Sequence, residues 1–456
     1  MGVSLLTTAC IPEQASVTCP IPDMTSPNEQ PVVNISVYVD GTPSMQGYVS
    51  SSTSRYAQTI ESLLRVLKVE SVGFDGQPRP LGETTYFRLG NNSATQKVDR
   101  ISEAEYRQAA LNDFYSGTNS RLPFLQVAEI DAAIVPPSTD QNKLTIIITD
   151  LYQREEDTAK IVTRIQQYIE ASDQEGAVGI VGVRSEFKGT IYSESLTGSG
   201  DFFYASESNP QRPFYILFIG QLEDVHFYLD NLIKKLQFNQ GIESVILSPY
   251  KMFMSVASLD KKTNDEITPE QRQQFSIPSN SIKHDRLVVN LEDPNIQPLI
   301  LRSMDLINWP MQVNLEPISH VLLPSELEVR TIPKSFNRNT QTFEEDAQFP
   351  SLQQAINLNN INLDGNMVNL TTQISSEQIS PSGIYAFESD VTVKTSGTPF
   401  SEPEWWSTWS GTKSRPSGNQ TTDLNLFMTD LNNRMVSLMR RQPPLVGRFC
   451  YVIQKP

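Results

Sequence analysis

Val32–Gln46 reads VVNISVYVDGTPSMQ and decides how the first half of the chain is interpreted. An alternating apolar strand, Val33–Val39, runs directly into Asp40, and two hydroxyl residues, Thr42 and Ser44, follow at two-residue spacing. The end of a buried strand is where open α/β sheets bind their ligands. Carboxylate and hydroxyl oxygens suit a hard divalent cation such as magnesium, so this loop predicts a metal site.

Two later segments fit the same picture. Leu144–Asp150, LTIIITD, is rich in β-branched residues, as a strand buried on both faces should be, and it also ends in an acid. Between the two strands lies Ser116–Ser120, SGTNS, whose glycine permits a sharp turn before a helix-like apolar segment, Leu122–Ile130. We expect this turn to bring the hydroxyl of Thr118 towards Asp40.

This arrangement resembles a von Willebrand factor type A (vWA) domain with a metal-ion-dependent adhesion site (MIDAS). That family has Asp-x-Ser-x-Ser after its first strand, a Thr in a later loop, and an Asp after a further strand. Thr42 stands where the family usually has Ser, and Pro43 is an unusual neighbour. The resemblance implies one Mg2+ ion (or Mn2+ or Ca2+), with an open coordination position that a carboxylate from a protein partner fills. The matching positions are Asp40, Thr42, Ser44, Thr118 and Asp150.

Strands and amphipathic helices alternate over residues 32–240. Alternation of this kind is typical of a sheet covered on both faces, with crossovers between parallel strands. We therefore predict an α/β fold with a doubly wound, mostly parallel, vWA/Rossmann-like sheet, interrupted by a hairpin insertion at 187–212. The predicted helices are Ser54–Leu67, Asp157–Ala171 and Leu222–Leu236, and the later strands are Ala177–Val183 and Phe214–Gly220.

Beyond residue 240 the helical periodicity disappears and short strand-like runs follow one another, as in a β-sandwich. We predict a β-rich domain at 241–345 and a second β-rich unit at 346–456, which contains one long C-terminal helix at 422–440. A Trp cluster at 405–409 is expected to pack against that helix, and a stacking platform for a sugar or peptide is the alternative. Residues 1–31 are interpreted as a signal remnant and a Pro-rich tether.

The net charge restricts the possible partners, and the cysteines indicate where the protein is located. The chain has 456 residues and a net charge of -16, which argues against nucleic acid or an anionic membrane as a partner. Val3–Cys10, VSLLTTAC, resembles the end of a bacterial lipoprotein signal peptide, with Cys10 as the lipidated residue. Cys19 and Cys450 then remain as a disulfide pair in an oxidising compartment, and Cys10–Cys19 is the competing pair.

The sequence therefore predicts a metal-dependent protein-binding protein, an adhesion or scaffold protein and not an enzyme. It is expected in the bacterial cell envelope or secreted, and at the membrane only through a lipid anchor. One alternative is a metal-assisted phosphoester hydrolase with Asp40 or Thr42 as nucleophile. The other is a structural subunit of an envelope assembly whose metal site is vestigial.

Overall fold

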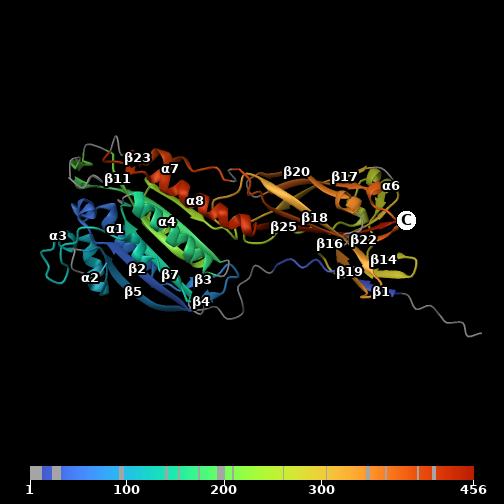
Figure 1. The fold of residues 1–456 in the computed structure, drawn as a ribbon, viewed down its shortest axis with the longest axis horizontal. Coiled ribbons are helices and arrows are strands. Elements are labelled where there is room, and N and C mark those ends of the chain that lie inside the picture. Colours follow the sequence, from blue (N-terminus) through green and yellow to red (C-terminus); the bar gives the residue numbers. More distant parts are fainter. Residues whose placement is uncertain are drawn as a thin grey trace, which may run out of the picture.

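The structure, a computed structural model, has an elongated shape with an α/β lobe at one end and a β lobe at the other (Figure 1). It describes residues 13–22, 32–91, 97–138, 142–151, 155–172, 175–192, 201–207, 210–259, 261–303, 306–345, 350–364, 367–397, 400–412 and 417–456.

The α/β lobe is built on a seven-stranded sheet with the strand order β12-β8-β11-β7-β2-β5-β6. Its strands are β2 (Val33–Asp40), β5 (Leu81–Leu89), β6 (Val98–Ile101), β7 (Asn142–Thr149), β8 (Gly176–Ser185), β11 (Arg212–Gln221) and β12 (Ile242–Leu247). The central strands are almost wholly buried, because helices cover both faces.

The predicted doubly wound, mostly parallel sheet is wrong. Strands take up more of the chain than helices and lie in several mixed sheets. Within the seven-stranded sheet, only the two pairings of β2, with β5 and with β7, are parallel among the described residues. β11 runs antiparallel to both of its neighbours, β7 and β8, and β12 and β6 are antiparallel to theirs.

The reason lies in the connection between β8 and β11. Residues 187–212 contain no described helix; instead β9 (Lys188–Ile191) and β10 (Phe202–Ala205) pair antiparallel. Without a helical crossover, the chain returns beside β8 in the opposite direction and lies between β8 and β7. An antiparallel strand buried on both faces has the same continuous apolar sequence as a parallel one, so composition could not reveal its direction.

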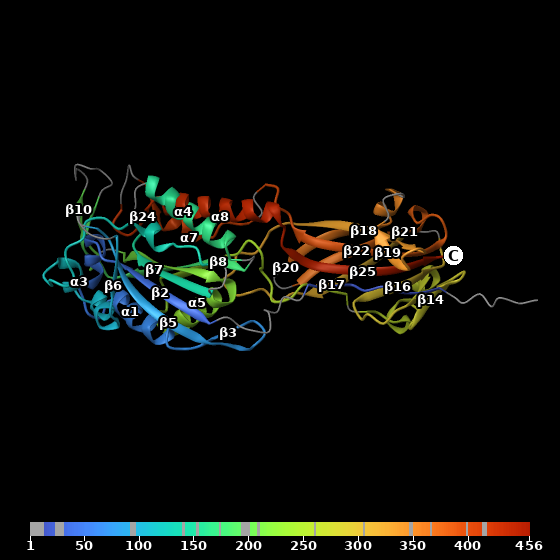
Figure 2. The same cartoon turned by 60° about the horizontal axis from the view of Figure 1, so that its bottom comes forward.

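Figure 2 shows helices on both sides of this sheet. α1 (Arg55–Val66) and α5 (Leu222–Leu236) pack on one face, and α4 (Glu155–Glu170) packs on the other. The Ser54 side chain begins α1 by accepting a hydrogen bond from the Ala57 amide. None of the helices in the described ranges is both long and apolar enough to cross a membrane.

The C-terminal helix is in a different place from the one predicted. α8 (Leu424–Arg441) does not belong to the β-rich region but lies beside α4 on the seven-stranded sheet (Figure 1). Arg441 binds Glu170 of α4 at 2.9 Å. Trp405, Trp406 and Trp409, in and next to α7 (Glu404–Thr408), are at most 6% exposed and pack with α8, as predicted.

Leu122–Ile130 was expected to be helix-like, and this is also wrong. The segment runs without helix along the end of the sheet, where Asn91 and the stretch Gln126–Val127 exchange backbone hydrogen bonds. Pro123 lacks an amide hydrogen, and its carbonyl accepts from the buried Arg88 at 2.7 Å. Tertiary hydrogen bonds therefore replace the helical ones that the apolar spacing suggested.

In the described part of the β lobe, the strands form three sheets. The largest has the order β13-β16-β25-β22-β18-β19, and smaller ones have the orders β17-β21-β20 and β1-β15-β14. Their bounds are β1 (Glu13–Ser16), β13 (Phe275–Ser276), β14 (Ser281–His284), β15 (Leu287–Asn290), β16 (Ile296–Leu301), β17 (Leu306–Asn314), β18 (Leu327–Asn337), β19 (Thr342–Glu345), β20 (Ile356–Asp364), β21 (Met367–Ser375), β22 (Gly383–Val393) and β25 (Leu445–Lys455).

Short elements complete the described fold. They are β3 (Ser71–Val72), β4 (Pro78–Arg79), β23 (Ser410–Gly411), β24 (Thr421–Thr422), α2 (Glu103–Arg107), α3 (Asp113–Ser116), α6 (Pro269–Gln274), and the 3-10 turns η1 (Pro43–Val49), η2 (Gln108–Ala110), η3 (Ile130–Ala133), η4 (Asn264–Glu266), η5 (Pro350–Gln354) and η6 (Ser376–Gln378).

β25 organises the β lobe because its two faces contact different sheets. Cys450 forms a disulfide with Cys19 and packs with residues of β1, β14 and β15. The adjacent Tyr451 points the other way, and its hydroxyl lies 2.7 Å from that of Thr372 on β21. β1 lies in the segment interpreted as a tether, yet it pairs in parallel with β15.

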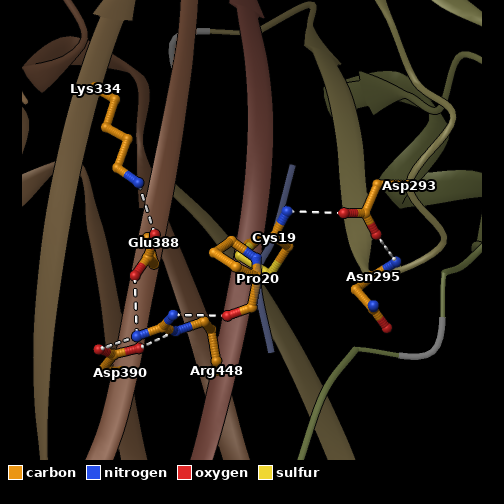
Figure 3. The surroundings of a disulfide bond; sticks show 9 residues. Cys19, Pro20, Asp293, Asn295, Lys334, Glu388, Asp390 and Arg448 are labelled. Carbon is orange, nitrogen blue, oxygen red and sulfur yellow. Dashed lines mark hydrogen bonds and ion pairs between the residues drawn. A yellow bond between two sulfur atoms is a disulfide. The ribbon is translucent and has the colours of Figure 1, made fainter. Parts of the chain in front are cut away.

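Polar contacts surround the disulfide (Figure 3). The Cys19 amide donates to Asp293 at 2.7 Å, and Arg448 donates to the Pro20 carbonyl at 2.8 Å. The same guanidinium binds both oxygens of Asp390. The segment that carries Cys19 is therefore held by charge-assisted hydrogen bonds to β25 and to the loop between β15 and β16.

Removing the disulfide is expected to loosen this segment. The bond joins residues 431 positions apart, so Cys19→Ser should lower the free energy of unfolding by about 2–5 kcal/mol. Urea unfolding measures the loss, and hydrogen exchange should show faster exchange in β1. Cys10→Ser is the control and should change neither. Equal stability of the Cys19 variant and the native chain would contradict this role.

Candidate functional site

The candidate site lies where β2 and β7 end side by side. Asp40 is the last residue of β2, and Asp150 directly follows β7. Because these two strands are parallel, their carboxyl ends meet at the same edge of the sheet. Both side chains are about 1% exposed, which is unusual for carboxylates.

The loop after β2 turns two hydroxyls towards these acids. Thr42 directly precedes η1, but its side chain does not cap the turn. Its hydroxyl instead donates to Asp40 Oδ1 at 2.6 Å. Pro43 follows at the first position of the turn, where a missing amide hydrogen costs nothing.

A chain of short contacts joins the two carboxylates. From Asp40 it runs through Thr42 Oγ1 to Ser44 Oγ at 3.1 Å, and from Ser44 to Asp150 Oδ1 at 3.3 Å. Thr149 adds a further contact by donating to Asp40 Oδ2 at 3.0 Å. Four of the five predicted ligands are therefore linked directly to one another.

This chain has fewer protons than contacts. Thr42 and Ser44 supply one hydroxyl proton each, but three oxygen–oxygen contacts connect Asp40 to Asp150. Two ionised carboxylates would therefore leave one contact without a proton. A proton on a carboxylate, or a cation bound among the four oxygens, removes this shortfall.

Burial makes the protonated state of Asp40 accessible. Loss of solvation and, second, the nearby charge of Asp150 together raise the pKa of its carboxyl to about 6, although hydrogen bonds from Thr42 and Thr149 lower it. Two carboxylates and two hydroxyls form an all-oxygen donor set that fits Mg2+ or Mn2+. The set contains only two carboxylates, and the described residues include no group of three or more His, Cys, Asp or Glu side chains that could hold a metal ion.

Arg212 supplies a positive charge at the edge of the site. It begins β11, is 4% exposed, and has its guanidinium 3.6 Å from Asp150 Oδ2. The carbonyls of Gly418 and Gln420 accept hydrogen bonds from the same guanidinium at 3.2 and 3.1 Å. Arg212 therefore partly neutralises the negative charge of Asp150 without any bound ion.

Arg88 lies beneath the loop and explains Gly41. It is 1% exposed and donates to the carbonyls of Phe114 at 2.5 Å and Gly41 at 3.3 Å. A Cβ at Gly41 would lie only 2.6 Å from Arg88 Nε. The glycine is therefore required by the close approach of a side chain.

Gly47 fixes the other side of the loop. A Cβ there would lie 2.4 Å from the ring of Phe187, next to the β9–β10 hairpin. The hairpin therefore packs tightly against η1, and Arg212 lies over the ring of Phe187.

Thr118 is not linked to the other four predicted ligands. It follows Gly117, which has a positive φ of 69°, and its side chain is exposed. Its hydroxyl lies 2.8 Å from that of Ser116, and no described hydrogen bond joins it to Asp40. Cys10, the predicted lipidation position, lies outside the described residues.

Sequence reasoning missed Thr149, Arg88 and Arg212. Thr149 precedes Asp150 in the strand, so it could have been included as a hydroxyl at the same sheet edge. The two arginines gave a weaker signal, a lone basic residue in or beside an apolar run. They become part of the site only through the strand order.

Large apolar side chains are exposed at the same end of the α/β lobe. Leu111, Phe124 and Phe203 are 51%, 45% and 66% exposed, and we name them the tip residues. They lie close to α3 or on β10, and both elements are at the end of the α/β lobe farthest from the β lobe (Figure 2). Exposed large apolar side chains of this kind are available for contacts with a partner.

Comparisons with known proteins add no identification. No family model matches the chain, and no curated protein or solved structure matches it either. The vWA resemblance therefore rests on the motif at the ends of β2 and β7 and stays a hypothesis.

The buried Asp40 predicts a pH dependence of stability. Its pKa rises from 3.8 to about 6 on folding, so the folded state binds an extra proton between these values. That stabilisation is present at about pH 4 and is lost as the pH rises through 6. The free energy of unfolding of the native chain, measured relative to that of Asp40→Asn, should therefore fall by roughly 3 kcal/mol between about pH 4 and 7.

Urea unfolding at several pH values, with chelator present, measures this difference. Asp265→Asn, which replaces an exposed carboxylate on η4, is the control. The difference in unfolding free energy between this variant and the native chain should change by less than about 0.5 kcal/mol over the same pH range. A difference for Asp40→Asn that does not change with pH would contradict the assignment.

Proposed function

We propose that this chain is a metal-dependent protein-binding protein of the cell envelope or the extracellular space. One divalent cation, Mg2+ or Mn2+, is held at the end of the α/β lobe. The ligands are the carboxylates of Asp40 and Asp150 and the hydroxyls of Thr42 and Ser44.

The proton shortfall between the two carboxylates carries this proposal. Three contacts of 2.6, 3.1 and 3.3 Å share two hydroxyl protons, so one contact has no proton when both carboxylates are ionised, and a cation among the four oxygens would compensate for it. Near neutral pH a pKa of about 6 leaves Asp40 mostly ionised, which favours the cation over the proton.

The surroundings support a protein as the partner. Ser44, at 8% exposed, is the most accessible of the four ligands, so a carboxylate of the partner approaches the cation from its side. The tip residues lie at the same end of the lobe and offer apolar contacts. Neutral hydroxyl ligands leave positive charge on the cation, which attracts an acidic group.

The disulfide supports the location. Disulfides persist in oxidising compartments such as the periplasm or the extracellular space and are rare in the cytosol. Cys19–Cys450 joins two buried residues, and its environment is completed by charge-assisted hydrogen bonds.

A second candidate, a structural protein without a metal, is favoured by one observation. The guanidinium of Arg212 already faces Asp150 at 3.6 Å and is held by two backbone carbonyls. In that case Arg212 and a proton on Asp40 together balance the two carboxylates.

Thermal unfolding in chelator and in MnCl2 tests the metal site. A cation that binds only the folded chain stabilises it by about 2.7 kcal/mol at a hundredfold excess over Kd. In Asp40→Ala and Asp150→Ala, MnCl2 should give no stabilisation relative to the same variant measured in chelator. Thr118→Ala is the matched control and should keep it. No Mn2+ gain in the native chain would support the structural candidate instead.

Binding to a partner should depend on the same cation. The immobilised chain, incubated with envelope extract and cross-linked, should retain a partner with Mn2+ and lose at least about nine-tenths of it with chelator. Phe203→Ser should weaken capture because it removes an exposed ring of the tip. Val72→Ser, at an exposed apolar position on β3, is the control. Equal capture with and without Mn2+ would contradict metal dependence.

A further inference from the structure

A cleft of 470 Å³ opens in the β lobe between β18 and β20. Its size lies within the range of binding pockets for small ligands and short peptides. It is lined by Leu327, Val329, Thr331, Gln353, Asn357, Leu358, Asn359, Asn360 and Ile361.

The two strands contribute to the cleft differently. β18 contributes every second residue between 327 and 331, so the cleft faces one side of that strand. β20 contributes five consecutive residues, Asn357–Ile361, so the cleft runs along its backbone edge. The opening is therefore bounded by a side-chain surface and by a strand edge.

That edge has no partner strand among the described residues. β20 is the last strand of the sheet β17-β21-β20 and pairs only with β21. β18 pairs with β22 along Leu327–Ser335, but with β19 only along Lys334–Asn337. An unpaired edge presents N–H and C=O groups at alternate residues, which is a template for one more strand.

The lining of the cleft is uncharged. None of its nine lining residues is charged, whereas Glu328 and Arg330 of β18 are exposed on the opposite side of the strand. Gln353 and Asn360 are exposed, whereas the side-chain amides of Asn357 and Asn359 donate to the Gln354 carbonyl and to Gln373. An occupant therefore has uncharged side chains and uses hydrogen bonds from amides and from backbone.

We propose that this cleft binds an extended, uncharged segment of a partner protein, which pairs with the edge of β20 as an added strand. Alternate side chains of the segment lie on Leu327 and Val329, and the others face solvent beside Asn357 and Asn359. The bulge between Asn359 and Asn362, with Asn360 at a φ of 55°, ends the pairing, so Ile356–Asn359 sets the register.

The probe is a capped peptide of about seven residues in which Thr and Val alternate, long enough to cover the pairing segment Ile356–Asn359. Hydrogen exchange is measured on the native chain with this peptide and with two comparison peptides. One comparison peptide carries Glu in place of Val, and the other has methylated backbone nitrogens. Only the unmodified neutral peptide should slow exchange at residues 356–359, because only it supplies both backbone donors and uncharged side chains.

Matched variants on β18 test the side-chain surface. Val329→Lys places an amine in the cleft and should weaken peptide binding at least about tenfold. Glu328→Lys adds a similar side chain one position away on the exposed side and should change binding less than about twofold. Far-UV circular dichroism and unfolding curves check that both variants fold.

Three results would overturn the proposal. The first is no protection at about 1 mM peptide. The second is equal binding of the methylated peptide, which shows that no strand is added. The third is protection of residues 356–361 by a neutral oligosaccharide when the peptide has no effect, which assigns the cleft to sugars. Because neither probe nor variants involve Asp40, failure here leaves the proposed metal site unaffected.

Discussion

The structure depends on covering the apolar outer face of β8 and β11. α4 covers only part of that face, and α7 and α8, from the end of the chain, bury the rest. The chain then enters β25, the strand between β16 and β22 in the largest sheet of the β lobe. One continuous segment therefore contributes to the cores of both lobes, so the lobes are joined through packing as well as through a linker.

The same segment reaches the candidate site. The carbonyls of Gly418 and Gln420 orient Arg212, and the Tyr215 hydroxyl binds Thr421 at 3.0 Å. Arg212 in turn faces Asp150, so residues near the C-terminus adjust the charge around a loop near the N-terminus. Burying two carboxylates is unfavourable unless nearby dipoles and charges compensate, and here they come from parts of the chain far apart in sequence.

The molecule thus has distinct features at different places along its length. The oxygen cluster and the tip residues lie at the end of the α/β lobe, whereas the disulfide lies in the β lobe (Figures 1 and 3). The uncharged cleft beside β20 is also in the β lobe. Since the two candidate sites share no residue, a change of charge at one leaves the contacts of the other intact.

Local patterns determined part of this structure. The spacing of apolar residues gave α5 as Leu222–Leu236, because a helical face is repeated every three to four residues. The order acid, hydroxyl, hydroxyl after β2 placed Asp40, Thr42 and Ser44 on one loop. Tertiary structure alone decided that β11 lies antiparallel between β7 and β8, that α8 covers the first sheet, and that Arg212 rather than Thr118 adjoins the acids. Periodicity indicates which side of an element is buried, but not its direction or its partner, because those follow from packing between residues that are far apart in the sequence.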